Sequence, residues 1–187
     1  MDYQNHIGAY FEKLIDTIEK LDIEQINDAM REIEKAYKRQ GTIYIFGNGG
    51  SAATASHIVC DFNKGISDQK EKKFNVVCLN DNIPTITAIA NDIGYEEVFR
   101  YQLQSKLKEN DLVIAISGSG NSQNILLAAE YAKSKGIPIV ALCGYDGGKL
   151  KQIANYCMHV NINDMQITED IHMIFDHMMM RIFCESL

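Results

Sequence analysis

The chain has no excess of positive charge and no long apolar run. It carries 18 Lys and Arg against 25 Asp and Glu, for a formal charge of -7, and the basic residues are scattered along the sequence. Such a composition disfavours a surface for nucleic-acid phosphates, so we expect no nucleic-acid partner. No apolar segment approaches the roughly 18 residues that a membrane helix needs, and the N-terminus is acidic and polar. We therefore expect a protein that is not exported and has no membrane partner.

The cysteines lack the pattern of a disulfide framework or a zinc finger. They number five, an odd count, and they are widely spaced and mostly set in apolar runs. This arrangement favours reduced thiols within a core over disulfides or structural zinc ligands. The sequence therefore predicts a reducing, cytoplasmic location.

The length and apolar content suit one domain, residues 1–187. With 187 residues and 46% hydrophobic content, the chain can form one well-packed core, and no segment is of low complexity. In residues 1–40, apolar residues recur at helical spacing on both sides of a break at Leu21 and Asp22, which predicts a helical pair. The first helix has a long apolar stripe with no strand beside it. It either packs on another subunit or covers its own sheet.

From residue 42 onward, short β-branched runs alternate with helical patterns. This alternation predicts residues 41–187 to be an α/β core, a three-layer doubly wound parallel sheet covered by helices on both faces. We expect strands at 42–46, 75–79, 112–116, 137–142 and 157–161. We expect helices at 52–63, 84–93, 98–105, 122–135, 148–153 and 169–185. Ligands of such sheets collect at the carboxyl ends of the strands.

Two of the expected strands run into turns of glycine and small polar residues. The first turn is GNGGS at 47–51 and the second is SGSGNS at 117–122. Glycine lets the backbone approach an anion, the following helix contributes N–H groups and a favourable dipole, and serine adds short donors. Either turn alone could be an ordinary capped turn. Two on neighbouring strands predict a cradle for a small phosphorylated ligand.

The first turn also matches a dinucleotide pattern, G-x-G-x-x-A at 47–52. A dinucleotide site needs an acidic residue about 20 residues later, and the candidate here, Asp81, lies well beyond that spacing. Neither turn is followed by the lysine of a nucleotide triphosphatase. We therefore expect no nucleotide cofactor and rank a dinucleotide enzyme last.

Polar groups that can move protons occur in two clusters. His57 and Asp61, four residues apart, share a face of the helix after the first turn. The expected last helix carries acidic and histidine residues within an apolar stripe: Glu169, Asp170, His172, Asp176 and His177. A single histidine in such a stripe is more often a structural residue than a catalyst. Two clusters of matching chemistry favour acid–base catalysis.

These residues carry a family resemblance that covers nearly the whole chain. The segments are FGNGGSAATASH, TAIANDIGYEEVF, AISGSGNSQNILLAAEYAKSKG, CGYDGGKL and TEDIHMIFDH. Together they resemble the sugar isomerase (SIS) family, and within it the phosphoheptose isomerases. The resemblance implies an aldose-ketose isomerase that converts sedoheptulose 7-phosphate to D-glycero-D-manno-heptose 7-phosphate through an enediol. It also implies a homotetramer.

The resemblance assigns roles to individual positions. It implies that four serines surround the sugar phosphate and that Asn48 and Asp92 contact the sugar. The implied substrate-binding set is Asn48, Gly49, Gly50, Ser51, Asp92, Ser117, Gly118, Ser119, Ser122 and Glu169. The implied catalytic residues are Asp61 and His177, with Glu169 as an alternative base. Some members of the family bind Zn²⁺, here through the equivalents of His57, Asp61, Glu169 and His177.

Several positions depart from the family pattern. Asp61 replaces a glutamate, Glu169 replaces a glutamine, Gly118 stands where threonine is usual, and Gly65 takes the place of an arginine. On an ideal helix Glu169 and His177 differ by about 80° and about 12 Å of rise. Both reach one metal only if Glu169 lies at or before the start of its helix. These changes leave an alternative function open, a non-catalytic SIS regulator or a relative of the replication-initiator-associating protein.

Overall fold

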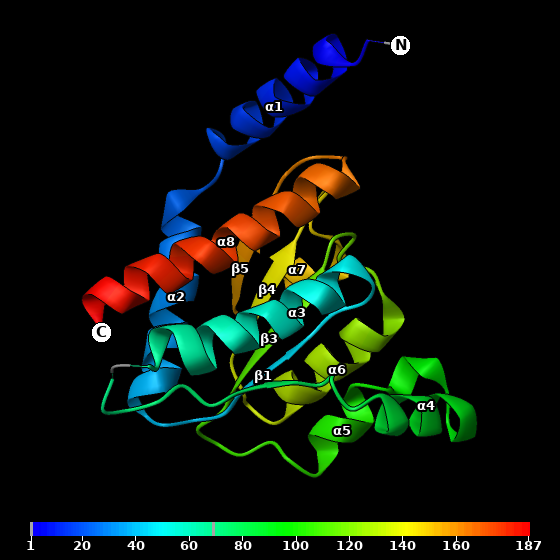
Figure 1. Ribbon diagram of the computed structural model, residues 1–187. Coiled ribbons are helices and arrows are strands. Elements are labelled where there is room, and N and C mark those ends of the chain that lie inside the picture. Colours follow the sequence, from blue (N-terminus) through cyan, green and yellow to red (C-terminus); the bar gives the residue numbers. More distant parts are fainter. Residues whose placement is uncertain (1, 69) are drawn as a thin grey trace.

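Five parallel strands form the centre of the molecule, which the computed structural model describes for residues 2–68 and 70–187 (Figure 1). The strands lie in the order β2-β1-β3-β4-β5. Their bounds are β1 Ile43–Phe46, β2 Val76–Cys78, β3 Leu112–Ser117, β4 Ile139–Cys143 and β5 Tyr156–His159. The connections diverge at β1 and β3, so the carboxyl ends of these two neighbouring strands flank the switch point of the sheet. The predicted α/β fold is confirmed.

Helices cover both faces of the sheet, which gives the predicted three layers (Figure 1). One face packs against α2, α3 and α8, and the other against α4, α5, α6 and α7. Alternate strand residues supply the two cores, as Ile45 points to the first and Tyr44 to the second. The helices are α1 Gln4–Ile18, α2 Ile23–Lys38, α3 Gly50–Cys60, α4 Ile83–Asp92, α5 Arg100–Gln104, α6 Gln123–Ser134, α7 Gly148–Ile153 and α8 Met165–Ser186, with short segments η1 Asp61–Ile66 and η2 Tyr95–Glu97.

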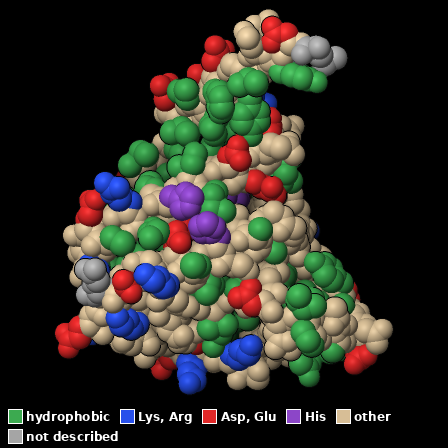
Figure 2. Space-filling view, viewed as in Figure 1, with side chains coloured by type: hydrophobic (Ala, Val, Ile, Leu, Met, Phe, Trp, Pro, Cys, Tyr) green, Lys and Arg blue, Asp and Glu red, His purple; other side chains and the backbone are tan. Residues whose placement is uncertain are grey.

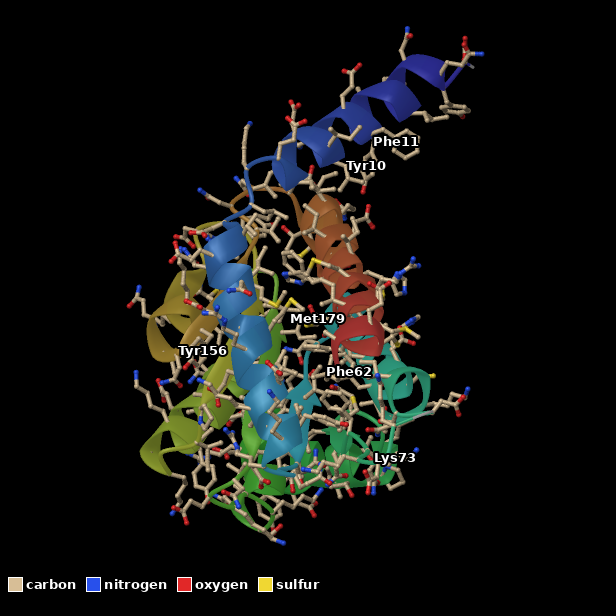
Figure 3. All side chains as sticks on the ribbon, turned by 90° about the vertical axis from the view of Figure 1, so that its left-hand side faces the viewer. Tyr10, Phe11, Phe62, Lys73, Tyr156 and Met179 are labelled. Carbon is tan, nitrogen blue, oxygen red and sulfur yellow. The ribbon has the colours of Figure 1, made fainter. Side chains whose placement is uncertain are left out.

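Helix α1 projects from the body of the molecule (Figure 1). Its apolar side chains are largely exposed, and hydrophobic atoms gather along it in Figure 2. Tyr10 and Phe11 lie on this helix, away from the interior where Phe62 and Met179 lie (Figure 3). Two polar contacts join α1 to the start of α8: Tyr10 donates to Asp170 over 2.6 Å, and Lys13 pairs with Asp164. Among the described residues, no helix combines the length and apolar character that crossing a membrane requires.

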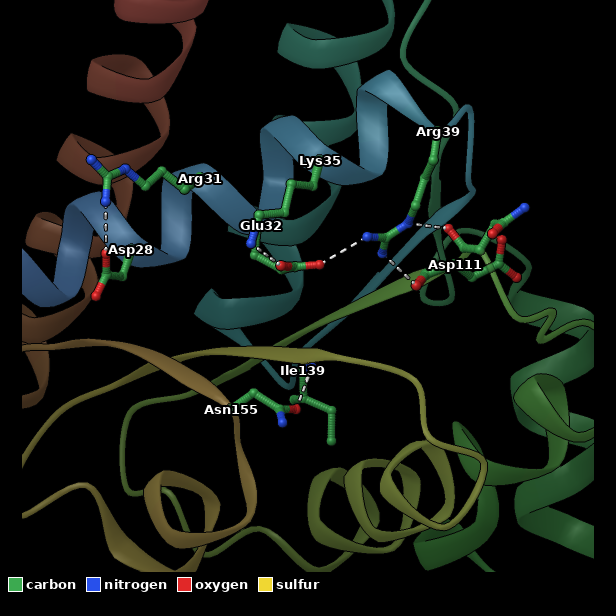
Figure 4. Close-up of polar contacts among 9 residues, drawn as sticks. Asp28, Arg31, Glu32, Lys35, Arg39, Asp111, Ile139 and Asn155 are labelled. Carbon is green, nitrogen blue, oxygen red and sulfur yellow. Dashed lines mark hydrogen bonds and ion pairs between the residues drawn. The ribbon is translucent and has the colours of Figure 1, made fainter.

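The C-terminal end of α2 is bonded to the start of β3 (Figure 4). Arg39 donates to the carbonyl oxygens of Asn110 and Asp111 and to the buried carboxylate of Glu32. The Asp111 side chain accepts from the N–H of Thr42, just before β1. These bonds hold the starts of β1 and β3 together, so the turns at their other ends are set side by side.

Most helix boundaries differ by one or two residues from the sequence prediction, and two larger differences bear on the site. Helix α8 begins at Met165, four residues before the expected start, because Asp164 caps it by accepting the N–H of Ile167. The helix expected at 52–63 is an α-helix only to Cys60 and continues as a π-helical segment, η1. The apolar pattern does not reveal this change because it shifts the hydrogen bonds by one residue without interrupting the buried face.

Candidate active site

The two glycine-serine turns meet in one small cavity at the carboxyl ends of β1 and β3. Its volume is about 170 Å³. The residues that line it are Asn48, Ser51, Ile116, Ser117, Gly118, Ser119, Ser122, Met165 and Glu169. Because seven of these are polar or glycine, the cavity offers hydroxyl and amide donors rather than an apolar lining. The structure thus brings most of the expected substrate-binding residues together.

Side chains that the sequence did not single out hold the first turn in place. Asn80 accepts from the N–H of Gly47 and donates to its carbonyl oxygen. Asn124 and Asn48 exchange amide hydrogen bonds of 2.9 Å, and the Tyr95 hydroxyl donates to Asn48 over 2.9 Å. Asn124 is buried, so its amide groups need these partners. The sequence around a single asparagine does not show that it belongs to such a network, because the network forms only where three separate segments of the chain come together in the fold.

The second turn depends on close backbone approach. Gly120 has a φ of +64°, and a Cβ there would lie 2.1 Å from the carbonyl oxygen of Gly147. The N–H of Gly144 donates to the carbonyl oxygen of Gly118 over 2.8 Å, which joins the turn to the end of β4. At Gly118 itself, a Cβ would lie 2.7 Å from the sulfur of Met165. The neighbouring methionine therefore occupies the space that a larger residue at 118 would need.

Glu169 lies beside the cradle, whereas Asp92 lies apart from it. A Cβ on Gly50 would meet the Glu169 carboxylate within 2.6 Å, so the absence of a side chain at Gly50 admits this carboxylate to the start of α3. Asp92 is exposed in the last turn of α4, where it accepts from Asn91. It is not among the described residues that line the cavity.

Helices α3 and α8 lie side by side and run in the same direction. Glu169 meets Gly50 near their starts, and His177 meets His57 further along, with 3.3 Å between the Nε2 atoms. Ser51 and His57 are six residues apart on α3, a rise of about 9 Å. Figure 2 shows the histidine side chains together at the surface, with acidic atoms beside them. A second polar site therefore lies about two helical turns from the cradle.

This second site is a four-residue cluster of two imidazoles and two carboxylates. His57, Asp61, Asp176 and His177 each offer one ligand atom, and these atoms all lie within 4.8 Å of one another. From the Nε2 of His57, the nearest carboxylate oxygens of Asp61 and Asp176 are 3.7 Å and 3.9 Å away. The histidines are exposed, and the side chain of Asp176 is 0% exposed. The imidazoles of the cluster are therefore accessible to solvent, whereas the Asp176 carboxylate is not.

The carboxylates of the cluster need a positive partner. Neither oxygen of Asp176 has a hydrogen-bond partner among the described residues, and the same holds for Oδ2 of Asp61. Burial, and after it the Asp61 carboxylate, raise the pKa of Asp176 to about 7, and His177 opposes this shift. Buried carboxylates are otherwise paired or coordinate a metal. Ligand atoms around a tetrahedral zinc lie about 3.3 Å apart, close to the separation of the two imidazoles.

Asp176 stands in this cluster where the family resemblance implied Glu169. Glu169 lies in the second turn of α8, about 12 Å of rise before His177, because the helix begins at Met165. The condition for Glu169 to share a site with His177 within one chain is thus not met. The sequence did contain a signal for Asp176, since it interrupts an apolar stripe beside His177.

A second buried titratable group, His172, predicts acid sensitivity. Burial lowers its pKa to about 4, below the ordinary value of 6.5. The unfolded chain therefore binds the proton more readily, and stability present above pH 6.5 is lost as the pH falls toward 4. The loss should reach about 3 kcal/mol. Chemical unfolding at several pH values should show a shallower pH dependence for His172→Leu than for the wild type.

The exposed His6 offers a matched control for this experiment. His6→Leu should keep the wild-type dependence on pH, because His6 lies on the exposed surface of α1 and outside the buried core. Equal slopes for the wild type and His172→Leu between pH 6.5 and 4 would refute the assignment.

Comparison with known proteins identifies the fold family. The sequence profile of the SIS domain matches residues 3–144. The chain belongs to the SIS domain family. Helix α8, which carries Glu169, Asp176 and His177, lies beyond the matched residues of the SIS profile.

Relatives of this SIS protein include phosphoheptose isomerases. The chain is 36% identical to the phosphoheptose isomerase of Helicobacter pylori over 171 residues, which cover 91% of this chain and 88% of that protein. It is 36% identical to phosphoheptose isomerase 2 of Campylobacter jejuni, covering 87% and 80% of the two chains. The structure of phosphoheptose isomerase from Neisseria gonorrhoeae matches with a TM-score of 0.90 and 27% identity, over 100% of both chains.

Proposed function

We propose that this SIS protein is a phosphoheptose isomerase that interconverts sedoheptulose 7-phosphate and D-glycero-D-manno-heptose 7-phosphate. The observation that carries the proposal is the pairing of two sites along α3: a cradle of glycine and serine, and an acid–base cluster about 9 Å further on. A linear sugar phosphate can place its phosphate in the first and its carbonyl end toward the second. The similarity to phosphoheptose isomerases over most of the chain supports this substrate.

The cradle binds the phosphate through neutral donors. Ser117, Ser119 and Ser122 supply hydroxyl groups at the second turn, and Ser51 supplies one at the start of α3. The first-turn backbone of Gly49 and Gly50 leads into α3, whose unpaired N–H groups and dipole favour an anion. Asn48 faces the same cavity and is already held by Asn124 and Tyr95, so it can contact a sugar hydroxyl without reordering. Asp92 is proposed only as a contact to the sugar end.

The isomerisation moves one proton between adjacent carbons. We assign Asp61 as the base that takes the proton from C1 of the ketose, and His177 as the group that gives a proton to the oxygen on C2. The product of this step is an enediol. Loss of the proton from the C1 hydroxyl and return of a proton to C2 then give the aldose. The Asp61 carboxylate lies beside the imidazoles of the cluster, and its Oδ2 has no hydrogen-bond partner among the described residues, so this oxygen is available to accept the proton.

The cluster also fits a zinc ion. His57, Asp61, Asp176 and His177 would hold it, and the unpartnered carboxylate oxygens would gain the positive neighbour that their burial requires. Bound there, zinc would act as a Lewis acid toward the oxygen that becomes negative in the enediolate. Each residue offers one ligand atom, so the second oxygen of Asp61 is left to accept a proton. Metal analysis of the purified protein tests the ligand set.

Glu169 is assigned to the lining of the phosphate cradle, where it affects substrate affinity, rather than to proton transfer, because its carboxylate lies at the cradle and not in the cluster. A carboxylate there repels a phosphate dianion. Glu169→Gln should therefore lower KM for sedoheptulose 7-phosphate about fivefold, the effect of about 1 kcal/mol of repulsion, and leave kcat within about threefold. Steady-state kinetics measures both. Asp170→Asn, one residue along and exposed, is the control and should change neither constant. A collapse of kcat in Glu169→Gln would make Glu169 the base.

The whole chain, residues 1–187, is proposed to act as one SIS domain within a homotetramer. Residues 1–40 would take part in subunit packing, because α1 presents exposed apolar side chains that its own sheet does not cover. These are Ile7, Tyr10, Phe11 and Ile15, with Tyr3 just before the helix. A cytoplasmic location is proposed on the five cysteines, all of which are free thiols. Analytical ultracentrifugation measures the assembly directly.

Incubation of the zinc-loaded and metal-free protein with sedoheptulose 7-phosphate tests the proposed function. Aldose formation, followed by NMR, is the expected result. Binding of the sugar phosphate without turnover by either form would instead support a non-catalytic SIS regulator.

A further inference from the structure

Two cysteines lie in contact beneath the second turn. Cys143 ends β4 and Cys157 lies in β5, and their sulfur atoms are 3.0 Å apart. Both are buried and both are free thiols. A disulfide has a sulfur separation of 2.03–2.05 Å, so an approach of about 1 Å would join them.

The sheet register keeps this pair together. Cys157 is paired with Ala141 and Cys143 with His159, so the two cysteines are diagonal neighbours on adjacent strands. Both side chains pack in the core on the α6 and α7 side of the sheet. Hydrogen bonds between β4 and β5 thus fix both thiols on one face, and their proximity does not depend on a mobile loop.

The two thiols differ in access and in acidity. Cys157 lines a polar cavity of about 250 Å³ with Gln25, Asp28 and Lys151, whereas Cys143 is 0% exposed. The hydrogen bond from Cys143 lowers the pKa of Cys157 against the opposing effect of burial, and the Lys151 ammonium lowers it further. The same bond, followed by burial, raises the pKa of Cys143. Cys157 is therefore the thiol that a small reagent reaches first.

We propose that Cys143 and Cys157 form a peroxide-sensitive dithiol that closes into a reversible disulfide. The Cys157 thiol gives up its proton, and the thiolate attacks one oxygen of a hydroperoxide; the O–O bond breaks, leaving a sulfenic acid on Cys157, and the departing hydroxide or alkoxide takes up that proton to leave as water or an alcohol. The Cys143 sulfur then attacks the Cys157 sulfur, the S–O bond breaks, and hydroxide leaves with the Cys143 proton as water. The two thiols lose two electrons and the peroxide gains them. A thiol reductant reverses the closure.

Formation of the Cys143–Cys157 disulfide should change the geometry of the phosphate cradle. Cys143 is paired in the sheet with Ser117, and the next residue, Gly144, donates to the carbonyl oxygen of Gly118. Movement of the Cys143 backbone toward Cys157 therefore displaces the second turn. This consequence, unlike the disulfide itself, rests on the proposed function.

Linkage mapping tests the disulfide without any substrate. Cys60 and Cys184 are exposed, so a Cys60→Ser/Cys184→Ser background removes competing surface thiols and leaves three of the five cysteines. Treatment with hydrogen peroxide should lower the free thiols from three to one. Non-reducing peptide mapping should then show one cross-link, between Cys143 and Cys157, that a thiol reductant removes. Cys78→Ser in this background is the matched control and should keep the cross-link.

The order of oxidation is tested by trapping. In the same background, Cys143→Ser should accumulate a sulfenic acid on Cys157 that dimedone labels, whereas Cys157→Ser should leave Cys143 unlabelled. Cross-links that involve Cys78, or Cys157 oxidised to sulfinic acid while Cys143 still reacts with an alkylating reagent, would overturn the proposal. So would an unchanged thiol count at peroxide concentrations that oxidise the exposed cysteines of the wild type.

A binding measurement tests whether the disulfide affects the phosphate cradle. Isothermal titration of the cross-linked protein with sedoheptulose 7-phosphate should show several-fold weaker binding, restored by reduction. A confirmed cross-link with unchanged binding would refute the coupling to the cradle. If the reduced protein does not bind this sugar phosphate, the proposed function fails and the linkage map still decides the dithiol.

Discussion

His177→Ala should lower kcat for sedoheptulose 7-phosphate by about 10²- to 10⁴-fold, the range for loss of a general acid or base. KM should change little because His177 lies in the cluster and not among the described residues that line the phosphate cavity. Asp61→Asn should have a comparable effect, since an amide cannot take the proton from C1. Steady-state formation of the aldose measures both variants.

The exposed histidine of α1 provides the control for this experiment. His6→Ala should retain wild-type kcat. His177 is itself exposed, so its replacement should leave the thermal unfolding temperature of the metal-free protein almost unchanged. If kcat of His177→Ala stays within a few-fold of the wild type, the cluster is not the centre of proton transfer.

Asp176→Asn should weaken zinc binding and stabilise the metal-free protein. The expected loss of zinc affinity is about 10²-fold or more, because the fully buried ligand loses its charge. Without metal, the wild-type carboxylate is buried beside Asp61 with no hydrogen-bond partner among the described residues. Its replacement by an amide removes this like-charge contact and should raise the unfolding temperature by about 2–4 °C, the shift for about 1 kcal/mol. Calorimetry with chelator and with zinc measures both effects.

Glu185→Gln is the matched control on the same helix, since Glu185 is exposed and pairs with Arg181. It should leave zinc affinity and stability unchanged, as expected for a surface ion pair. Unchanged zinc affinity in Asp176→Asn would remove Asp176 from the ligand set and return the fourth position to Glu169, which would then have to come from another subunit.

The cradle could be predicted from the sequence because each of its two turns is a short continuous segment. The turns at 47–51 and 117–122 each contain their own glycines and serines, and the strand pattern places both at one edge of the sheet. The supporting side chains were not readable. Asn80, Asn124 and Tyr95 act across segments far apart in the chain. Asn124 and Tyr95 lie within segments that carry the family resemblance, but nothing local in the sequence pairs either of them with Asn48.

The position of Glu169 shows how a small error in a helix boundary changes a site. An expected start at residue 169 would allow Glu169 to turn toward His177, whereas the Asp164 cap starts α8 one turn earlier and holds Glu169 at the cradle. The cap is a side-chain hydrogen bond to the N–H of Ile167, and Lys13 of α1 pairs with the same aspartate. The same aspartate thus both caps α8 and links its start to α1.

By itself, the sequence determined the α/β layers, which two strands are followed by phosphate-binding turns, and which residue types are available for acid–base chemistry. Apolar periodicity and turn chemistry depend on residues that are close in the sequence, so they can be recognised without knowledge of the fold. Only the tertiary structure decided which groups share a site. The parallel packing of α3 and α8 brings Asp176 and His177 to His57 and Asp61, and it leaves Glu169 beside Gly50, because side-chain neighbours across two helices depend on the register of their packing.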